Sequence, residues 1–349
     1  MMRTTTLALT ALLAGSGPMT AAAPQSREPV RVVTTLPVYA SIVEAIGGAE
    51  VRVSWIADPN EDPHFVRPRP SYALELRRAD LFVTTGLDLE LWVPALLDKA
   101  GNSSVLEGGR GYVTAYTGIT LLDIPPAADR SQGDVHIYGN PHLHTDPLRV
   151  IRVARNINTG LKRVAPERAD HFDEGFARFE AELHRRLFGT QLVEMLGGET
   201  LVRLAENGSL HEFLASQEFE GTPLGERLGG WLGAARSLSG ARIICYHKNW
   251  AYFEQRFGVT CAEYVETKPG IQPTPRHVAR LLELMRDEGI SVVLAASYFD
   301  SGRVESVARR GNARAVQVPM QPRARPGLQT YFDLVDLWIS ELTTALAAR

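Results

Sequence analysis

Short apolar runs alternate with segments of helical spacing along two stretches of the chain. The first stretch predicts strands at 30–36, 51–57, 80–85 and 112–116 and helices at 38–46, 71–79 and 89–100. The second predicts strands at 242–246, 259–265, 291–296 and 314–319 and helices at 249–257, 274–288, 303–310 and 330–346. Because short strands that alternate with helices of this length form parallel sheets flanked by helices, the sequence predicts an α/β fold with two similar lobes.

Two long helices are predicted between these stretches. One should follow Pro147 to about residue 164, and a second, with an apolar face, should run from Pro166 to Gly189. At 1.5 Å per residue the second helix is ~36 Å long, which is enough to join the two lobes rigidly. We therefore expect a first lobe over residues 23–165, a linking helix over 166–189, and a second lobe over 190–349 that begins with a glycine-rich insertion.

The N-terminus has the features of an export signal. Arg3 supplies a positive charge, residues 7–13 form an apolar run, and residues 20–23 are small. The apolar run is shorter than the ~20 residues that span a bilayer, and no later stretch has the pattern of a transmembrane helix. We expect residues 1–22 to be cleaved before Ala23 and the mature protein to be exported. No cysteine stands where the mature chain would begin, so we expect no lipid anchor.

Composition and charge narrow the class of partner. The chain has 349 residues, 44% hydrophobic and 22% charged, and at roughly 100–200 residues per domain it should form two domains. Its formal net charge of −3 leaves no basic excess, which argues against nucleic acid or an anionic membrane surface as a partner. The two cysteines, Cys245 and Cys261, either pair in an oxidising compartment or remain as buried free thiols.

Four polar side chains are candidates for a metal site. His64, His247 and Asp300 each follow a predicted strand, and His142 lies in a loop that Pro141 stiffens. Ligands of open α/β sheets bind outside the carboxyl ends of the strands. Three imidazoles and one carboxylate are the four donors of a tetrahedral Zn²⁺ site, whereas Mn²⁺ would draw more oxygen ligands. The sequence therefore predicts zinc in the cleft between the lobes, with two ligands from each.

Each candidate also has a simpler explanation. His64 could be a solvated loop residue, His247 could begin a helix, and Asp300 could be the N-cap of the helix at 303–310. His136 and His144 flank His142 and are either auxiliary ligands or ordinary loop residues.

Other nitrogen and sulfur donors are given structural roles. Cys245 shares a strand face with His247, so a thiolate ligand is conceivable, but burial or a bridge to Cys261 is favoured. Solvated surfaces account for the remaining histidines, which are His171, His184, His211 and His277.

Three segments resemble signature segments of the metal-specific solute-binding proteins of bacterial ABC importers, the zinc and manganese receptors. The segments contain Asp62-Pro63-His64, Gly139-Asn140-Pro141-His142 and Tyr246-His247-Lys248-Asn249-Trp250. The resemblance implies two lobes joined by a rigid helix, with the metal held between them by His64, His142, His247 and the carboxylate of Asp300. Manganese receptors tend to carry glutamate at the third position, so His247 favours zinc.

The resemblance also implies a function. We expect a periplasmic, monomeric, non-enzymatic receptor that captures Zn²⁺ and delivers it to an ABC transporter permease; a periplasmic metallochaperone is a second conceivable partner. The chain departs from the family pattern in the loop before His142. Many zinc receptors have a long loop rich in histidine and acidic residues there, whereas this loop is short and keeps only His136, and His144 stands where an aromatic residue is common.

Two rival functions remain open at this point. A secreted zinc hydrolase would need an open coordination position and a general base, and the chain contains no His-Glu-x-x-His motif. The other rival is a binding protein for a small organic solute, with the histidines incidental. Because ligation requires neutral imidazoles, histidine ligation predicts that zinc affinity falls as the pH drops through ~6.5.

Overall fold

The computed structural model describes residues 28–125, 136–266 and 270–348. The predicted export signal and its cleavage site lie outside these ranges. Among the described residues no helix is both long and apolar enough to cross a membrane.

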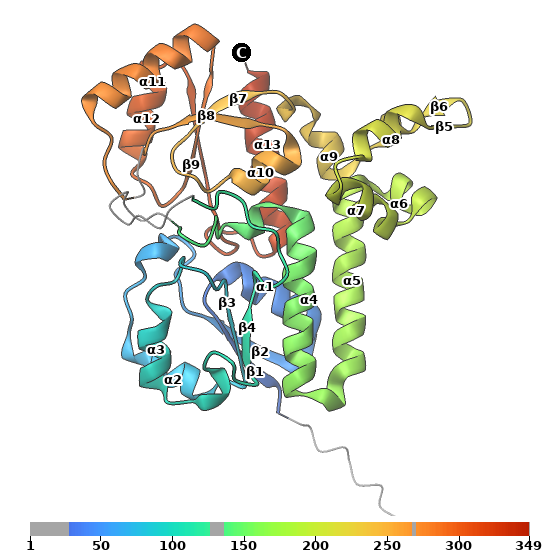
Figure 1. Cartoon of the computed structure of the whole chain (residues 1–349), viewed down its shortest axis with the longest axis vertical. Coiled ribbons are helices and arrows are strands. Elements are labelled where there is room, and N and C mark those ends of the chain that lie inside the picture. Colours follow the sequence, from blue (N-terminus) through green and yellow to red (C-terminus); the bar gives the residue numbers. More distant parts are fainter. Residues whose placement is uncertain (1–27, 126–135, 267–269, 349) are drawn as a thin grey trace, which may run out of the picture.

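The first lobe is built on a four-stranded parallel sheet in the order β2-β1-β3-β4. Its strands are β1 (Val30–Thr34), β2 (Val51–Trp55), β3 (Leu81–Thr84) and β4 (Tyr112–Thr114). Its helices are α1 (Pro37–Gly47), α2 (Pro70–Arg78) and α3 (Val93–Ala100). In Figure 1, α2 and α3 lie on one side of the sheet, and the long helices that follow lie on the other. The predicted β/α alternation is confirmed here.

The second lobe repeats this design with a parallel sheet in the order β10-β9-β7-β8. Its strands are β7 (Arg242–Cys245), β8 (Thr260–Tyr264), β9 (Val292–Ala296) and β10 (Arg314–Val318). Its helices are α10 (Ala251–Phe257), α11 (Pro275–Glu288), α12 (Ser301–Arg310) and α13 (Tyr331–Ala347). A disulfide between Cys245 and Cys261 joins β7 to β8, so Cys245 has no free thiolate to offer a metal.

Two long helices stand side by side next to the sheet of the first lobe (Figure 1). They are α4 (Pro147–Val164) and α5 (Ala169–Phe188). A short 3₁₀ turn at Pro166–Arg168 separates them, so α5 begins slightly later than predicted. The 20 residues of α5 span ~30 Å and contact α1 in the first lobe as well as α9 (Gly230–Ala234) beside the second.

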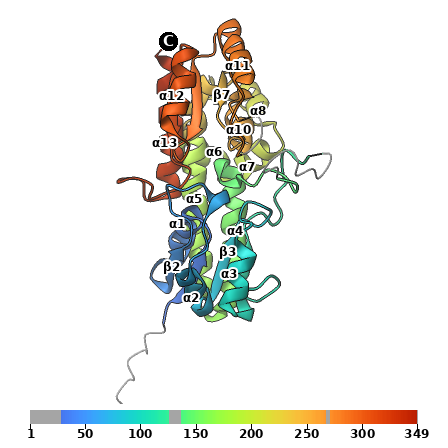
Figure 2. The same cartoon turned by 90° about the vertical axis from the view of Figure 1, so that its left-hand side faces the viewer.

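Small helices and a hairpin follow α5 and project from the side of the molecule (Figure 1). They are α6 (Thr190–Leu196), α7 (Gly198–Glu206), α8 (Leu210–Ser216), β5 (Glu218–Phe219) and β6 (Thr222–Pro223). The view in Figure 2 shows the two lobes stacked along the long axis, with α4 and α5 running beside them.

The chain between β10 and α13 also returns to the first lobe. The side-chain oxygen of Gln321 accepts a hydrogen bond from the Val38 backbone N–H at 3.0 Å, at the start of α1. One turn further on, Ser41 Oγ accepts from the Tyr331 backbone N–H at 3.0 Å. The lobes are therefore joined at the base of the cleft by more than the linking helix.

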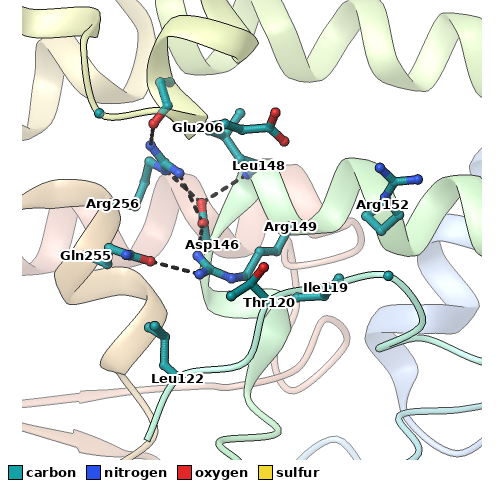
Figure 3. A pocket seen from close by; sticks show the side chains of 13 residues that line it. Ile119, Thr120, Leu122, Asp146, Leu148, Arg149, Arg152, Glu206, Gln255 and Arg256 are labelled. Atoms are coloured by element: carbon teal, nitrogen blue, oxygen red, sulfur yellow. Dashed lines mark hydrogen bonds and ion pairs between the residues drawn. The ribbon is translucent and has the colours of Figure 1, made fainter.

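A buried ion pair also crosses between the lobes (Figure 3). Asp146 is fully buried at the start of α4, where its carboxylate accepts from the Leu148 backbone N–H and caps the helix. The same carboxylate pairs with Arg149 at 2.5 Å and with Arg256 of α10 at 2.8 Å. One carboxylate thus fixes both the first turn of α4 and the position of α10 against it.

We predict that Asp146→Ala lowers the free energy of unfolding by about 3 kcal/mol or more, because it leaves two arginines without their buried counter-charge. Urea unfolding measures this change. Glu174→Ala is the matched control, because Glu174 forms an exposed ion pair with Arg178 whose loss should cost no more than about 1 kcal/mol. Equal losses in the two variants would show that the buried network does not join the lobes.

Candidate metal centre

Four histidines converge between the lobes: His64, His136, His142 and His247. One ring nitrogen from each lies within 4.8 Å of the others. His64 lies in a 3₁₀ turn after β2, and His136 and His142 lie in the loop between β4 and α4. His247 directly follows β7. The first lobe therefore supplies three of these imidazoles and the second lobe one, instead of the predicted two donors from each.

The Nδ1 atom of each ring faces an oxygen acceptor. The separations are 2.5 Å from His64 to Asp62, 3.0 Å from His136 to Asp88, 2.9 Å from His142 to Asn140 and 3.1 Å from His247 to Glu266. Ionised carboxylates only accept hydrogen bonds, so the rings beside them carry the proton on Nδ1. The amide of Asn140 donates to the Lys248 carbonyl at 2.9 Å, which turns its oxygen toward His142.

These hydrogen bonds leave the Nε2 lone pairs of the four rings for the centre of the cluster. The Nε2 atoms of His142 and His247 are buried and have no hydrogen-bond partner among the described residues. The Nε2 atoms of His64 and His136 lie 3.1 Å apart. Two nitrogens of a tetrahedral zinc centre with Zn–N bonds of ~2.0–2.1 Å are about 3.3–3.4 Å apart. The spacing and the orphaned nitrogens both fit a cation bound by four imidazoles.

Burial keeps the imidazoles of His142 and His247 neutral, and ionised carboxylates lie behind those of His64 and His136. Burial lowers the pKa of His142 well below its ordinary value, and the neighbouring histidines lower it further. Burial also lowers the pKa of His247, although Glu266 opposes the shift. For Asp62 and Asp88, burial alone would raise the pKa, but the hydrogen bonds from His64 and His136 lower it overall. A divalent cation would therefore meet neutral nitrogen donors at His142 and His247, and ionised carboxylates would lie behind the rings of His64 and His136.

Asp300, which the sequence predicts as the fourth ligand, is not part of this group. Its carboxylate accepts from the Arg303 backbone N–H at 2.8 Å and caps α12, and the residue is exposed. The loop after β9 instead presents Phe299, which lines the small cavity beside His64 and packs on His247 with 6.0 Å between ring centroids. The fourth imidazole of the group belongs to His136, which the sequence suggested only as an auxiliary ligand.

Three histidines outside the cluster are buried as well. His144 is buried outside the cluster, with Nε2 3.1 Å from the Met320 carbonyl and its ring beside Trp338. This contact fixes the loop to the segment that follows β10. His184 and His277 are buried, so the expectation of solvated surfaces was wrong for both.

Sequence reasoning missed the residues that orient the rings. Asp62 and Asn140 stand two positions before their histidines, and their side-chain oxygens accept from the backbone N–H of those histidines. Asp and Asn often form such turns, so this spacing could have been used to predict both contacts. Asp88 and Glu266 are separated from their partners by 48 and 19 positions, and nothing local marks them.

A larger hollow lies outside the histidine cluster. It has a volume of about 550 Å³ and is lined by Ile119, Arg152, Glu206, Gln255 and the Asp146 ion pairs (Figure 3). The cavity beside the histidines holds only about 110 Å³. Pockets for organic ligands usually measure ~300–1,000 Å³, so the histidine site has the size for an ion.

Known proteins with similar sequences bind metals. Manganese ABC transporter substrate-binding lipoprotein PsaA of Streptococcus pneumoniae is 21% identical over 287 residues, covering 82% of this chain and 78% of that protein. Zinc-binding lipoprotein AdcA of Streptococcus pneumoniae serotype 4 is 26% identical over 163 residues, covering 44% of this chain and 30% of that protein. Both are named lipoproteins, which conflicts with the expected absence of a lipid anchor.

Solved structures share the fold. The crystal structure of ZnuA has a TM-score of 0.67 at 19% identity and covers 91% of this chain and 100% of its own. A Mn-bound periplasmic metal-binding protein from candidatus liberibacter asiaticus has a TM-score of 0.64 at 16% identity and covers 91% of this chain and 99% of its own.

A family model described as the periplasmic component A of the zinc-uptake complex matches residues 32–186 and 231–345. These segments contain the histidines of the cluster and both parallel sheets, and they leave out most of the small helices after α5. On this evidence the chain belongs to the zinc-uptake component A family of metal-specific solute-binding proteins.

Proposed function

We propose that this protein is an extracytoplasmic zinc receptor that captures Zn²⁺ between its lobes and delivers it to the membrane permease of an ABC importer. The observation that carries the proposal is the set of four imidazoles with their Nδ1 atoms anchored and their Nε2 atoms directed inward. Family membership supports the transport role. One relative is named for manganese and another for zinc, so the choice between these metals is argued from the ligand atoms.

The ligand set favours zinc over manganese. Imidazole nitrogens suit Zn²⁺, whereas Mn²⁺ prefers carboxylate, carbonyl and water oxygens. Replacement of the expected Asp300 by His136 makes the site richer in nitrogen than the sequence suggested. Such a site would also hold Cu²⁺ or Ni²⁺ in a purified sample, because affinities of divalent ions follow the Irving–Williams order.

Four nitrogen ligands also argue for binding without catalysis. A catalytic zinc normally has three protein ligands and keeps the fourth position for water, whereas a closed site has four protein ligands. If His136 completes the set, no coordination position remains for a hydrolytic water. A zinc hydrolase is therefore disfavoured, because its mechanism requires an open coordination position on the metal.

Capture and release should involve movement between the lobes. Of the four ligands, His247 alone comes from the second lobe. Binding joins that imidazole to the three of the first lobe, and separating the lobes would reduce the site to three ligands. When the lobes separate, the weaker ligation would allow the zinc ion to pass to the permease.

The proposal keeps the expected location and molecular state. The receptor is exported and periplasmic, acts as a monomer, and exchanges zinc with a permease and, where one exists, a metallochaperone. Intact-mass measurement of the exported protein tests the predicted cleavage before Ala23.

We predict that His64→Ala, His136→Ala, His142→Ala and His247→Ala each weaken zinc binding at least about 100-fold, since even second-shell losses cost 10–100-fold. Competitive zinc titration and metal analysis measure the change. Asp300→Ala and the exposed His211→Ala should bind zinc like the native protein. A loss in Asp300→Ala comparable to that in His64→Ala, with His136→Ala unaffected, would restore the carboxylate and overturn the four-histidine site.

We predict that a large excess of Mn²⁺ does not displace bound zinc, because no oxygen ligand is among the four donors. Zinc should raise the stability of the protein by ~2.7 kcal/mol at 100 times its dissociation constant, and Mn²⁺ at the same concentration should give little stabilisation. Thermal unfolding with each ion measures both effects. Equal stabilisation by the two ions would contradict the zinc assignment.

We predict that zinc affinity is steady at neutral pH and falls in acid, because protons compete for the ligand nitrogens. Since burial holds the pKa values of His142 and His247 below 6.5, these rings stay neutral below the pH at which free histidine protonates. The fall should therefore begin lower than the ordinary histidine pKa suggests. Titrations from pH 7 to pH 4 test this, and an unchanged affinity at pH 4 would exclude ligation by histidine.

A further inference from the structure

A second group of metal-type donors lies outside the cleft, at the end of α5 that meets α7 (Figure 1). Glu180 and His184 are four positions apart on α5 and therefore share one face of the helix. Glu199 belongs to the first turn of α7. One ligand atom from each of these three side chains lies within 4.8 Å of the others.

His184 is the unusual member of this group. The residue is only 6% exposed, and its Nε2 atom has no hydrogen-bond partner among the described residues. Burial lowers the pKa of its imidazole, so the ring is neutral at pH 7 and has a lone pair to offer. A buried polar group without a partner is costly, and a bound cation is one way to satisfy it.

The start of α7 is built to approach this ring. A Cβ atom placed on Gly198 would lie 2.0 Å from His184 Nδ1, a distance that real Cβ atoms do not reach. Glycine at this position therefore lets the α7 backbone rest against the imidazole. The close approach brings the adjacent Glu199 to the same place as Glu180.

The two carboxylates repel each other there. Burial raises the pKa of Glu180, and the nearby charge of Glu199 raises it further. Arg155 offsets part of this repulsion through an ion pair with Glu180 Oε1 at 3.1 Å. The pair is half exposed on the arginine side and uses one oxygen of the carboxylate, which leaves Oε2 for another cation.

We propose that Glu180, His184 and Glu199 form a second binding site for a divalent transition metal, with Zn²⁺ as the best match. One imidazole and two carboxylates are a donor set that zinc accepts, with water in the remaining position. The site has fewer nitrogen donors than the cleft and includes the exposed Glu199, so it binds zinc more weakly and exchanges it with solvent. Bound metal would clamp α7 to α5.

The test uses the full chain and Zn²⁺ alone. The native protein should bind two zinc ions per chain by native mass spectrometry and titration, one of them more weakly. The triple variant His64→Ala/His142→Ala/His247→Ala should keep the weaker ion. In that background Glu199→Gln should weaken binding at least ~10-fold and His184→Ala should abolish it, while His211→Ala on α8 should change nothing.

The result for Glu199→Gln decides the matter, because Glu199 is exposed and its substitution leaves the fold intact. Zinc should also slow amide hydrogen exchange over α7 in the triple variant, and Glu199→Gln should remove that protection. A triple variant that binds no zinc, or whose zinc binding is unchanged by Glu199→Gln and His184→Ala, would overturn the second site. Neither outcome bears on the cleft, which the triple variant removes.

Discussion

The candidate metal site depends on the four hydrogen bonds at the Nδ1 atoms of its imidazoles, because these bonds orient the four Nε2 atoms toward one another. Each imidazole holds its Nδ1 atom against an oxygen, and each therefore turns Nε2 toward a common point. Without a cation, that arrangement concentrates lone pairs in a buried space, which is unfavourable. With a cation, the same lone pairs become ligands and the carboxylates behind three of the rings balance its charge. The inward-facing lone pairs thus both destabilise the empty site and provide the affinity for a cation.

The fold brings these groups together by a simple route. Parallel strands present their carboxyl ends at one edge of each sheet, and the loops that leave those ends carry the histidines. Stacking the two lobes end to end places one such edge opposite the other (Figure 2). The helix α5, the return segment before α13 and the Asp146 ion pairs hold the lobes in register. In the proposed function, a site that draws ligands from both lobes would be filled or broken by their relative movement.

Most of the fold could be predicted because its signals are local. The alternation of strands and helices, and the apolar stripe of α5, are periodic patterns that packing did not override. His64, His142 and His247 could be found because they follow strand ends or proline-stiffened turns. The structure brings these three together, as the sequence predicted.

The fourth imidazole of the cluster, that of His136, could not be found in this way. An aspartate before a helix looks the same in sequence whether it caps the helix or binds a metal, and Asp300 caps α12. His136 lies in a polar loop without periodicity, and the residue that orients it, Asp88, is 48 positions away. His184 was misjudged for a related reason, because its burial depends on α7 crossing over α5, which no local pattern announces.

X-ray absorption at the zinc edge tests the central claim most directly. The protein should be loaded with one equivalent of Zn²⁺, so that the stronger site in the cleft is filled. The account predicts four nitrogen neighbours at ~2.0–2.1 Å, with the outer-shell scattering of four imidazole rings, and one fewer ring in His136→Ala. A spectrum with three imidazoles and a carboxylate or water oxygen in the native protein, unchanged by His136→Ala, would contradict it.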